Sequence, residues 1–166
     1  FLPMLDTDIE ELHRRGVSIG FIGQRGDFAP EIVEKMAWAE ALTAGNGALR
    51  LNVAGSYGGR WDIVNACRSL LAEAGAALDP ADITESSLGR HMELDEQPEP
   101  DLLIRTGGDC RISNFLLWQS AYTEFWFTPT LWPDIDRSHL QEAVNEFGRR
   151  ERRFGLISEQ LGSGHT

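Results

Sequence analysis

In the first half of the chain, the spacing of hydrophobic residues switches several times between the helical pattern and the alternating pattern of a strand. Apolar residues keep a helical spacing over 5–15, alternate over 17–23, and form a helical stripe after Pro30. Residues 49–53 alternate again, and residues 63–74 return to a helical spacing. The pattern predicts a helix, a strand, a helix, a strand and a helix, in that order.

The second half of the chain has two short apolar runs separated by polar segments. Residues 102–104 and the aromatic residues 125–127 are continuous apolar runs, which predict strands buried on both faces. Residues 115–122 are predicted to form a helix between them, and Asp136 is expected to cap a last helix. The inward side chains of that last helix are expected to be Leu140, Ala143, Val144 and Phe147.

The alternation of strands and helices predicts an α/β fold with a mostly parallel central sheet flanked by helices. No repeat or linker interrupts it, so residues 1–166 are predicted to form a single domain, with 156–166 as a flexible tail. Ligands of such sheets bind beyond the carboxyl ends of the strands. Two polar segments, 55–60 and 105–113, directly follow predicted strands and are therefore the candidate binding loops.

Charge and cysteine content narrow the function. The formal net charge of −11 repels nucleic acid phosphates, so a nucleic acid partner is not expected. The two cysteines, Cys67 and Cys110, form no metal or disulfide pattern. Neither a signal peptide nor an apolar run of membrane-spanning length is visible, and a cytoplasmic location is the expectation.

The segment from Arg105 to Ser113 has the composition of an anion site. Two arginines, Arg105 and Arg111, flank a pair of glycines, and guanidinium groups bind diphosphate bidentately. Glycine lets backbone N–H groups approach an anion, and Ser113 would add a hydroxyl near the start of the next helix. The residues alone support an alternative equally well, in which the arginines only pair with Asp101 or Asp109.

Three other features carry weaker signals. The glycine loop at 58–60 enters a helix and could hold phosphate, but glycines often only turn a chain. Glu124, beside the aromatic strand, could ligate Mg²⁺ or be an ordinary strand-edge charge. The arginines at 149–153 also fit a solvated helix end. The four histidines show no metal-binding spacing and are expected at the surface.

Long motifs in this sequence resemble the undecaprenyl diphosphate synthase family of cis-prenyltransferases. They are DLLIRTGGDCRISNFLLWQSAYTEFWFTPTLWP at 101–133, RRERRFG at 149–155, YGGRWDI at 57–63 and EALTAGN at 40–46. The resemblance covers nearly the whole chain in the same order. It implies a mostly parallel sheet flanked by helices and a homodimeric assembly.

The resemblance implies cis-prenyl chain elongation. Isopentenyl diphosphate would be joined to an allylic diphosphate such as farnesyl diphosphate, giving a polyprenyl diphosphate and pyrophosphate, with Mg²⁺ assisting. By motif position, Arg105, Arg111 and Ser113 are expected to bind the diphosphate of isopentenyl diphosphate, and Glu124 to help hold Mg²⁺. Peripheral contact with a membrane, through the lipid product, is a further expectation.

Two further assignments come from the same resemblance. Arg153 and Gly155 match the family's carboxyl-terminal RxG element, which reaches into the substrate site of the partner subunit. Leu49 and its strand are expected to line the tunnel that receives the growing chain.

The sequence also departs from the family pattern. The family opens with a strand and an aspartate-glycine-asparagine-arginine-tryptophan loop whose aspartate is the main metal ligand, and this motif is absent here. The expected fold therefore lacks its amino-terminal strand and the main catalytic aspartate, so residues 1–166 alone are expected to be unstable and inactive. Asp109, Cys110 and Ser56 stand where bacterial relatives often carry glutamate, histidine and asparagine.

Two functions remain open on the sequence. One is the elongating enzyme itself. The other is a non-catalytic accessory subunit that donates the RxG element to a catalytic partner. Retention of Arg105, Arg111, Ser113 and Glu124 favours the enzyme, because an accessory subunit has no need of a diphosphate site.

Overall fold

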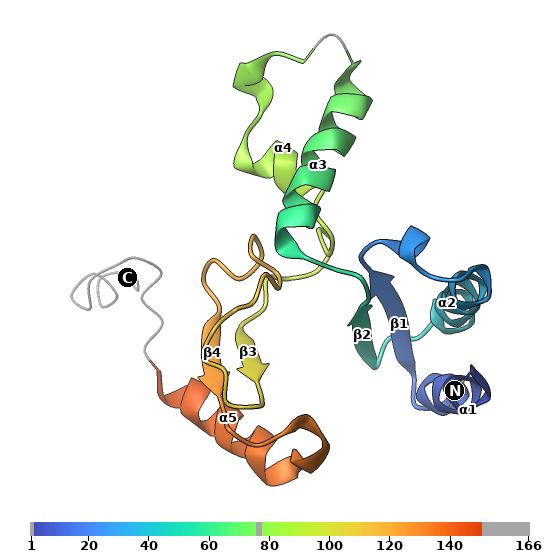
Figure 1. Ribbon diagram of the computed structural model, residues 1–166, viewed down its shortest axis with the longest axis vertical. Coiled ribbons are helices and arrows are strands. Elements are labelled where there is room, and N and C mark those ends of the chain that lie inside the picture. Colours follow the sequence, from blue (N-terminus) through green and yellow to red (C-terminus); the bar gives the residue numbers. More distant parts are fainter. Residues whose placement is uncertain (1, 76–77, 151–166) are drawn as a thin grey trace, which may run out of the picture. The chain divides into compact units, whose positions relative to one another are not determined.

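The computed structural model describes residues 2–75 and 78–150, which fall into two compact units divided after Gln97. Each unit contains one pair of parallel strands (Figure 1). The predicted α/β class and parallel pairing are confirmed.

The first five α-helices and strands of the first unit follow the predicted order of helix, strand, helix, strand and helix. Its elements are α1 (Leu2–Arg14), β1 (Val17–Ile22), α2 (Pro30–Thr43), β2 (Leu49–Ala54), α3 (Gly59–Ala74) and α4 (Glu85–Gly89). Figure 1 shows α1 and α2 beside β1, and the three elements are in contact. Ile9, Ile19 and Ala39, one from each element, form the buried cluster that joins them.

Side chains from the EALTAGN segment cover the outer edge of β1. Thr43 Oγ1 accepts the N–H of Ile19 at 2.9 Å, and Glu40 Oε1 accepts the N–H of Phe21 at 3.0 Å. The amide of Asn46 donates to the carbonyl of Val17 at 2.8 Å. These side chains satisfy backbone groups that an edge strand otherwise leaves unpaired. The segment therefore closes the β1–β2 pair on the β1 side.

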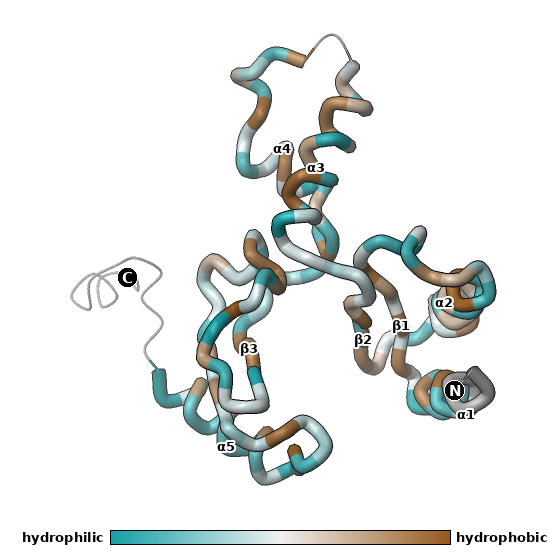
Figure 2. The backbone as a smooth tube through the Cα atoms, in the orientation of Figure 1, coloured by the Kyte–Doolittle hydropathy of each residue, from teal (hydrophilic) through white to brown (hydrophobic). Residues whose placement is uncertain are grey.

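Strand β2 differs from β1 in burial. Val17 and Ile19 of β1 are less than 10% exposed, whereas Leu49, Leu51 and Val53 of β2 are 60%, 37% and 40% exposed. Figure 2 shows hydrophobic positions along both strands. Within the described part of the first unit, an apolar strand face thus remains in contact with solvent, which is unusual for alternating Leu and Val.

The second unit contains β3 (Leu102–Arg105), β4 (Glu124–Phe127) and α5 (Arg137–Arg149). The two strands pair in parallel, with Leu102 opposite Glu124 and Arg105 opposite Phe127. Strand β3 is half-buried along its length, so the prediction of a strand buried on both faces is wrong for it. In β4, only Trp126 is buried.

The segment between β3 and β4 contains no helix, so the predicted helix at 115–122 is wrong. The chain forms successive turns there, because Ser113, Asn114 and Leu116 have φ angles of 49°, 63° and 44°. Such angles lie in the left-handed region and cannot continue a right-handed helix. The apolar residues of this segment pack without helical order.

Helix α5 begins as predicted at Asp136, whose carboxylate accepts the N–H groups of Ser138 and His139. The predicted inward face is only partly correct. Ala143 is fully buried, but Leu140 and Val144 are 45% and 53% exposed. No helix among the described residues is long and apolar enough to cross a membrane.

Candidate functional site

Arg105, Arg111 and Ser113 come together at the carboxyl end of β3, as the sequence predicted. Arg105 Nη1 donates to the Ser113 hydroxyl at 2.7 Å and to the Arg111 carbonyl at 2.5 Å. The Arg105 side chain thereby holds the far end of the loop over 105–113 close to the end of β3. We refer to Arg105, Arg111 and Ser113 as the basic loop site.

Asp109 joins both guanidinium groups of the basic loop site. Its Oδ2 accepts from Arg105 Nη2 at 2.9 Å and from Arg111 Nη2 at 2.7 Å. The pairing that the sequence offered as an alternative to anion binding is therefore present, at a carboxylate that is 43% exposed. An exposed ion pair of this kind contributes only about 0–1 kcal/mol, so an incoming diphosphate can compete for the same donors.

A cavity of about 220 Å³ opens beside this loop. Arg105 and Ser113 form its polar part, and the remaining lining residues are Leu103, Ile104, Ile112 and Phe115. An apolar wall next to a cationic and hydroxyl wall suits a small ligand with an anionic head and a short hydrocarbon.

The glycine pair in this loop has a different role from the one predicted. The N–H groups of Gly107 and Gly108 donate to the carbonyls of Thr130 and Thr128 at 2.9 and 3.0 Å. These two N–H groups therefore hydrogen-bond to the segment that follows β4 and are not available to bind an anion. Glycine is required here by conformation, since both φ angles exceed +80°.

Ser113 also lacks the helix dipole that the sequence suggested. In the described chain the residues directly after Ser113 form turns and no helix, and both Ser113 and Asn114 adopt left-handed backbone angles. Such strained positions in non-glycine residues each cost about 1–3 kcal/mol and gather at functional sites. Anion binding at this loop therefore depends on side chains.

Glu124, the predicted Mg²⁺ ligand, forms an ion pair with an arginine. Its Oε2 accepts from Arg150 Nη1 at 2.8 Å, and the same nitrogen donates to the Phe125 carbonyl. Arg150 Nη2 also reaches Glu146 Oε1 at 2.5 Å. Hydrogen bonding to the Arg150 guanidinium lowers the pKa of Glu146 from its ordinary value.

The carboxylates do not assemble a metal site on their own. Among residues 2–75 and 78–150, no group of three His, Cys, Asp or Glu side chains lies close enough to hold an ion. Mg²⁺ requires several oxygen ligands in near-octahedral geometry, and Glu124 already accepts from a guanidinium. Arg153 and Gly155 lie outside the described residues.

The second glycine loop, before α3, is organised around a buried carboxylate that the sequence did not single out. Asp62 is fully buried and accepts from the Tyr57 hydroxyl at 2.7 Å and from the Glu93 N–H at 2.9 Å. Gly23 makes this arrangement possible, because its φ is +106° and a Cβ there would meet the Gly55 carbonyl oxygen at 2.2 Å. These contacts favour the prediction that the loop mainly turns the chain.

Two carboxylates near the ends of β1 and β2 have pKa values shifted in opposite directions. Burial raises the pKa of Glu93, and the neighbouring Asp62 charge adds to the effect. Burial also opposes ionisation of Glu40, but hydrogen bonds from Arg25 and the Phe21 N–H outweigh it and lower its pKa. Arg25 donates two hydrogen bonds to Glu40, from Nη1 to Oε2 at 2.9 Å and from Nη2 to Oε1 at 2.5 Å.

The chain matches known proteins over almost its whole length. Residues 2–155 match the family described as "Putative undecaprenyl diphosphate synthase". A ditrans,polycis-undecaprenyl-diphosphate synthase ((2E,6E)-farnesyl-diphosphate specific) of Xanthomonas axonopodis pv. citri is 53% identical over 100% of this chain. An isoprenyl transferase of Nitrosomonas europaea is 52% identical over 97% of it.

A solved structure has the same fold. The crystal structure of lavandulyl diphosphate synthase from Lavandula x intermedia, in complex with dimethylallyl diphosphate, superposes with a TM-score of 0.84 at 37% identity. The match covers 92% of this chain and 67% of that one. The chain spans 65% and 60% of the lengths of the Xanthomonas and Nitrosomonas relatives.

Proposed function

Because the chain belongs to the undecaprenyl diphosphate synthase family, we propose that it provides the isopentenyl diphosphate site of a cis-prenyltransferase. The reaction joins isopentenyl diphosphate to an allylic diphosphate and releases pyrophosphate. The allylic primer would be farnesyl diphosphate, the diphosphate for which the Xanthomonas relative is named specific. The enzyme is favoured over an accessory subunit because the relatives carry enzyme names and the basic loop site is intact.

One observation carries the proposal: the cavity beside β3 is polar at Arg105 and Ser113 and apolar elsewhere. Isopentenyl diphosphate has the matching form, an anionic diphosphate on a five-carbon hydrocarbon. The guanidinium groups of Arg105 and Arg111 would bind the diphosphate and displace Asp109 from part of its bonding. The contribution of these residues is positioning of the nucleophilic double bond, which is a large part of catalysis for two bound substrates.

Mg²⁺ belongs to the proposal through family membership. It would neutralise charge on the departing diphosphate when bound. Glu124 is the candidate ligand from this chain, and it would exchange its bond to Arg150 for the ion. The described carboxylates alone do not fit the ion, so the remaining oxygen ligands would come from substrate phosphate and from residues outside the described part.

The assembly and location are also proposals. The two units would form one domain, and two copies would form a homodimer in which Arg153 and Gly155 reach the partner's substrate site. The exposed face of β2, including Leu49, would line the tunnel for the growing apolar chain. The enzyme would act in the cytoplasm and contact the membrane surface through its lipid product.

An incorporation assay tests this function. The natural full-length protein is incubated with radiolabelled isopentenyl diphosphate, farnesyl diphosphate and Mg²⁺, and the products are separated by chain length. Label in a polyprenyl product supports the enzyme. A well-folded protein that incorporates no label contradicts it and favours the accessory subunit, which a catalytic partner would then activate.

A further inference from the structure

We propose that His139 is a positioning residue for the isopentenyl diphosphate site. It would hold the chain that leaves β4, and through that chain the Gly107–Gly108 turn that leads into the basic loop site. The consequence for substrate binding rests on the proposed function, whereas the effect on the loop does not.

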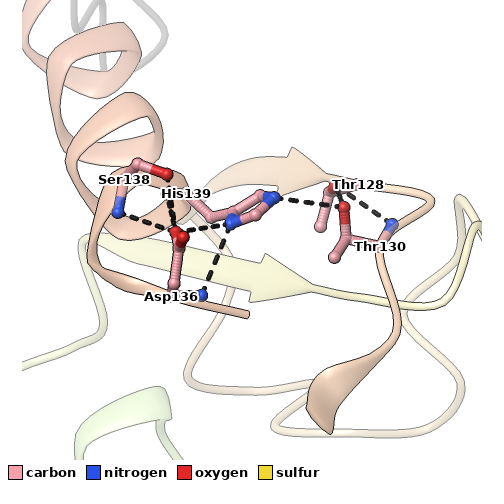
Figure 3. Close-up of polar contacts among 5 residues, drawn as sticks. All are labelled: Thr128, Thr130, Asp136, Ser138 and His139. Carbon is pink, nitrogen blue, oxygen red and sulfur yellow. Dashed lines mark hydrogen bonds and ion pairs between the residues drawn. The ribbon is translucent and has the colours of Figure 1, made fainter. Parts of the chain in front are cut away.

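His139 links the start of α5 to the end of β4 (Figure 3). Its Nδ1 lies 2.8 Å from Asp136 Oδ1, and its Nε2 lies 3.3 Å from Thr130 Oγ1. The imidazole is 28% exposed, so it is largely shielded from water. The ring therefore connects two elements of the second unit, and its position at the helix end is fixed by the cap residue Asp136.

The contacts along this link continue from the ring into the turn that follows β4. Nδ1 of His139 lies 2.8 Å from Asp136 Oδ1 and 3.4 Å from the backbone nitrogen of Asp136, and Nε2 lies within hydrogen-bond distance of the Thr130 hydroxyl. A hydroxyl can donate or accept, so either ring tautomer can make the bond to Thr130. Thr128 Oγ1 donates to Thr130 Oγ1 at 3.1 Å and accepts the N–H of Thr130 at 3.3 Å. The Thr128 hydroxyl thus makes two bonds within the turn over 128–130, and the Thr130 hydroxyl ties this turn to the ring.

The same turn holds the glycines of the basic loop. The carbonyls of Thr130 and Thr128 accept the N–H groups of Gly107 and Gly108 at 2.9 and 3.0 Å, and the N–H of Thr128 donates to the Arg105 carbonyl at 3.0 Å. Arg105 is the residue whose guanidinium organises the site. A shift of the 128–130 turn would therefore move the backbone from which Arg105 and its loop project.

Substitutions can separate this role from ordinary helix capping. Glutamine is a common partner in the capping-box position that His139 occupies, so His139→Gln retains the cap of α5 but lacks a ring that also reaches Thr130. Thr130→Val removes the other end of the link, and Thr130→Ser restores a hydroxyl. Ser138→Ala is the matched control, because it deletes the 2.6 Å bond from Ser138 to Asp136 but removes neither contact of the His139 ring.

The experiment uses the natural full-length protein and two measurements. Amide hydrogen exchange reports the protection of Gly107 and Gly108 without requiring activity, and steady-state kinetics give KM and kcat for isopentenyl diphosphate. His139→Gln and Thr130→Val are each expected to accelerate exchange and to raise KM about three- to tenfold, the size of one net hydrogen bond. Changes in kcat should be small, Thr130→Ser and Ser138→Ala should resemble wild type, and the double variant should resemble either single variant.

Two results would overturn the proposal. Unchanged glycine exchange in both His139→Gln and Thr130→Val would show that the turn does not depend on the link. Equal effects in Ser138→Ala would assign the changes to helix capping. If wild-type protein does not turn over isopentenyl diphosphate, the proposed function fails, but the exchange measurement still decides whether His139 holds the loop.

Discussion

Arg150 Nη1 lies 2.8 Å from Glu124 Oε2, so the carboxylate predicted to hold Mg²⁺ is neutralised by a guanidinium in this structure. Both side chains are about one-third exposed. Arg150 has a second carboxylate partner in Glu146, which would retain the arginine if Glu124 turned toward a metal. Glu124 could therefore exchange its bond to Arg150 for a bond to Mg²⁺. Glu146, the other carboxylate on Arg150, provides a control for substitutions of Glu124.

The first prediction concerns Mg²⁺ dependence. Glu124→Gln is expected to raise the Mg²⁺ concentration that gives half-maximal activity about tenfold, because loss of a carboxylate ligand weakens the ion's binding. A Mg²⁺ titration of the incorporation rate measures it. Glu146→Gln makes the same chemical change at the other partner of Arg150 and should leave the titration unchanged. An unaltered titration for Glu124→Gln, or equal shifts for both variants, contradicts the ligand role.

The second prediction concerns the backbone of the basic loop. Gly107→Ala should destabilise the protein by about 1–2 kcal/mol, because the φ angle of +87° is strained for alanine. A Cβ at this position would meet no other atom, so no steric clash adds to this cost. The cost is therefore conformational strain alone. Gly26 also has open space around its Cα but lacks a positive φ, so Gly26→Ala should change the free energy of unfolding by less than about 0.5 kcal/mol. Urea denaturation of both variants makes the comparison, and equal stability of the two would refute the strain.

The third prediction uses the lowered pKa of Glu40. A carboxylate whose pKa is lower in the folded state stabilises the protein above its ordinary pKa of 4.5, and this contribution disappears as the pH falls through the folded value. Glu40→Gln should therefore destabilise the protein at pH 7 by about 1–2 kcal/mol and by less at pH 3. Denaturation midpoints between pH 3 and pH 7 measure the difference, and a deficit that does not depend on pH would contradict it.

The fourth prediction has the opposite sign, because the pKa of Glu93 is raised. Its folded state favours the protonated carboxyl, so the residue costs stability as the pH rises above its ordinary pKa of 4.5. Glu93→Gln should raise the denaturation midpoint at pH 7, and the gain should vanish near pH 3. A variant that is less stable than wild type at pH 7 would show that the charged form of Glu93 is needed by the fold.

How far the sequence predicted this structure depends on the element. Alternation placed β1 and β2 correctly, and the Asp136 cap was correctly predicted because its signal lies within four residues. The helix predicted at 115–122 is wrong because Ser113, Asn114 and Leu116 have left-handed backbone angles, which hydrophobic periodicity does not report. The exposure of Leu140 and Val144 was not predicted either, because a hydrophobic stripe on a helix does not indicate which of its residues other elements cover.

The site shows the same division. The structure brings Arg105, Arg111 and Ser113 into contact, and their role in binding diphosphate stays a prediction. The N–H groups of the glycine pair instead bond the carbonyls of Thr128 and Thr130, about twenty residues farther along the chain. The histidines were expected at the surface, and His139 instead joins two elements. Its partner Thr130 lies nine residues before it, a spacing that no motif rule covers. Arg153 and Gly155 stay predictions.

The most direct test of the central claim is calorimetric titration of the natural full-length protein with isopentenyl diphosphate. Arg105→Ala removes the donor that organises the basic loop site and should weaken binding about 10- to 100-fold, as expected for loss of charge-assisted hydrogen bonds. Arg137→Ala removes an equal charge from an exposed position of the same unit and should change binding less than about threefold. Equal affinities for wild type and Arg105→Ala would contradict the assignment of this loop to the diphosphate of isopentenyl diphosphate.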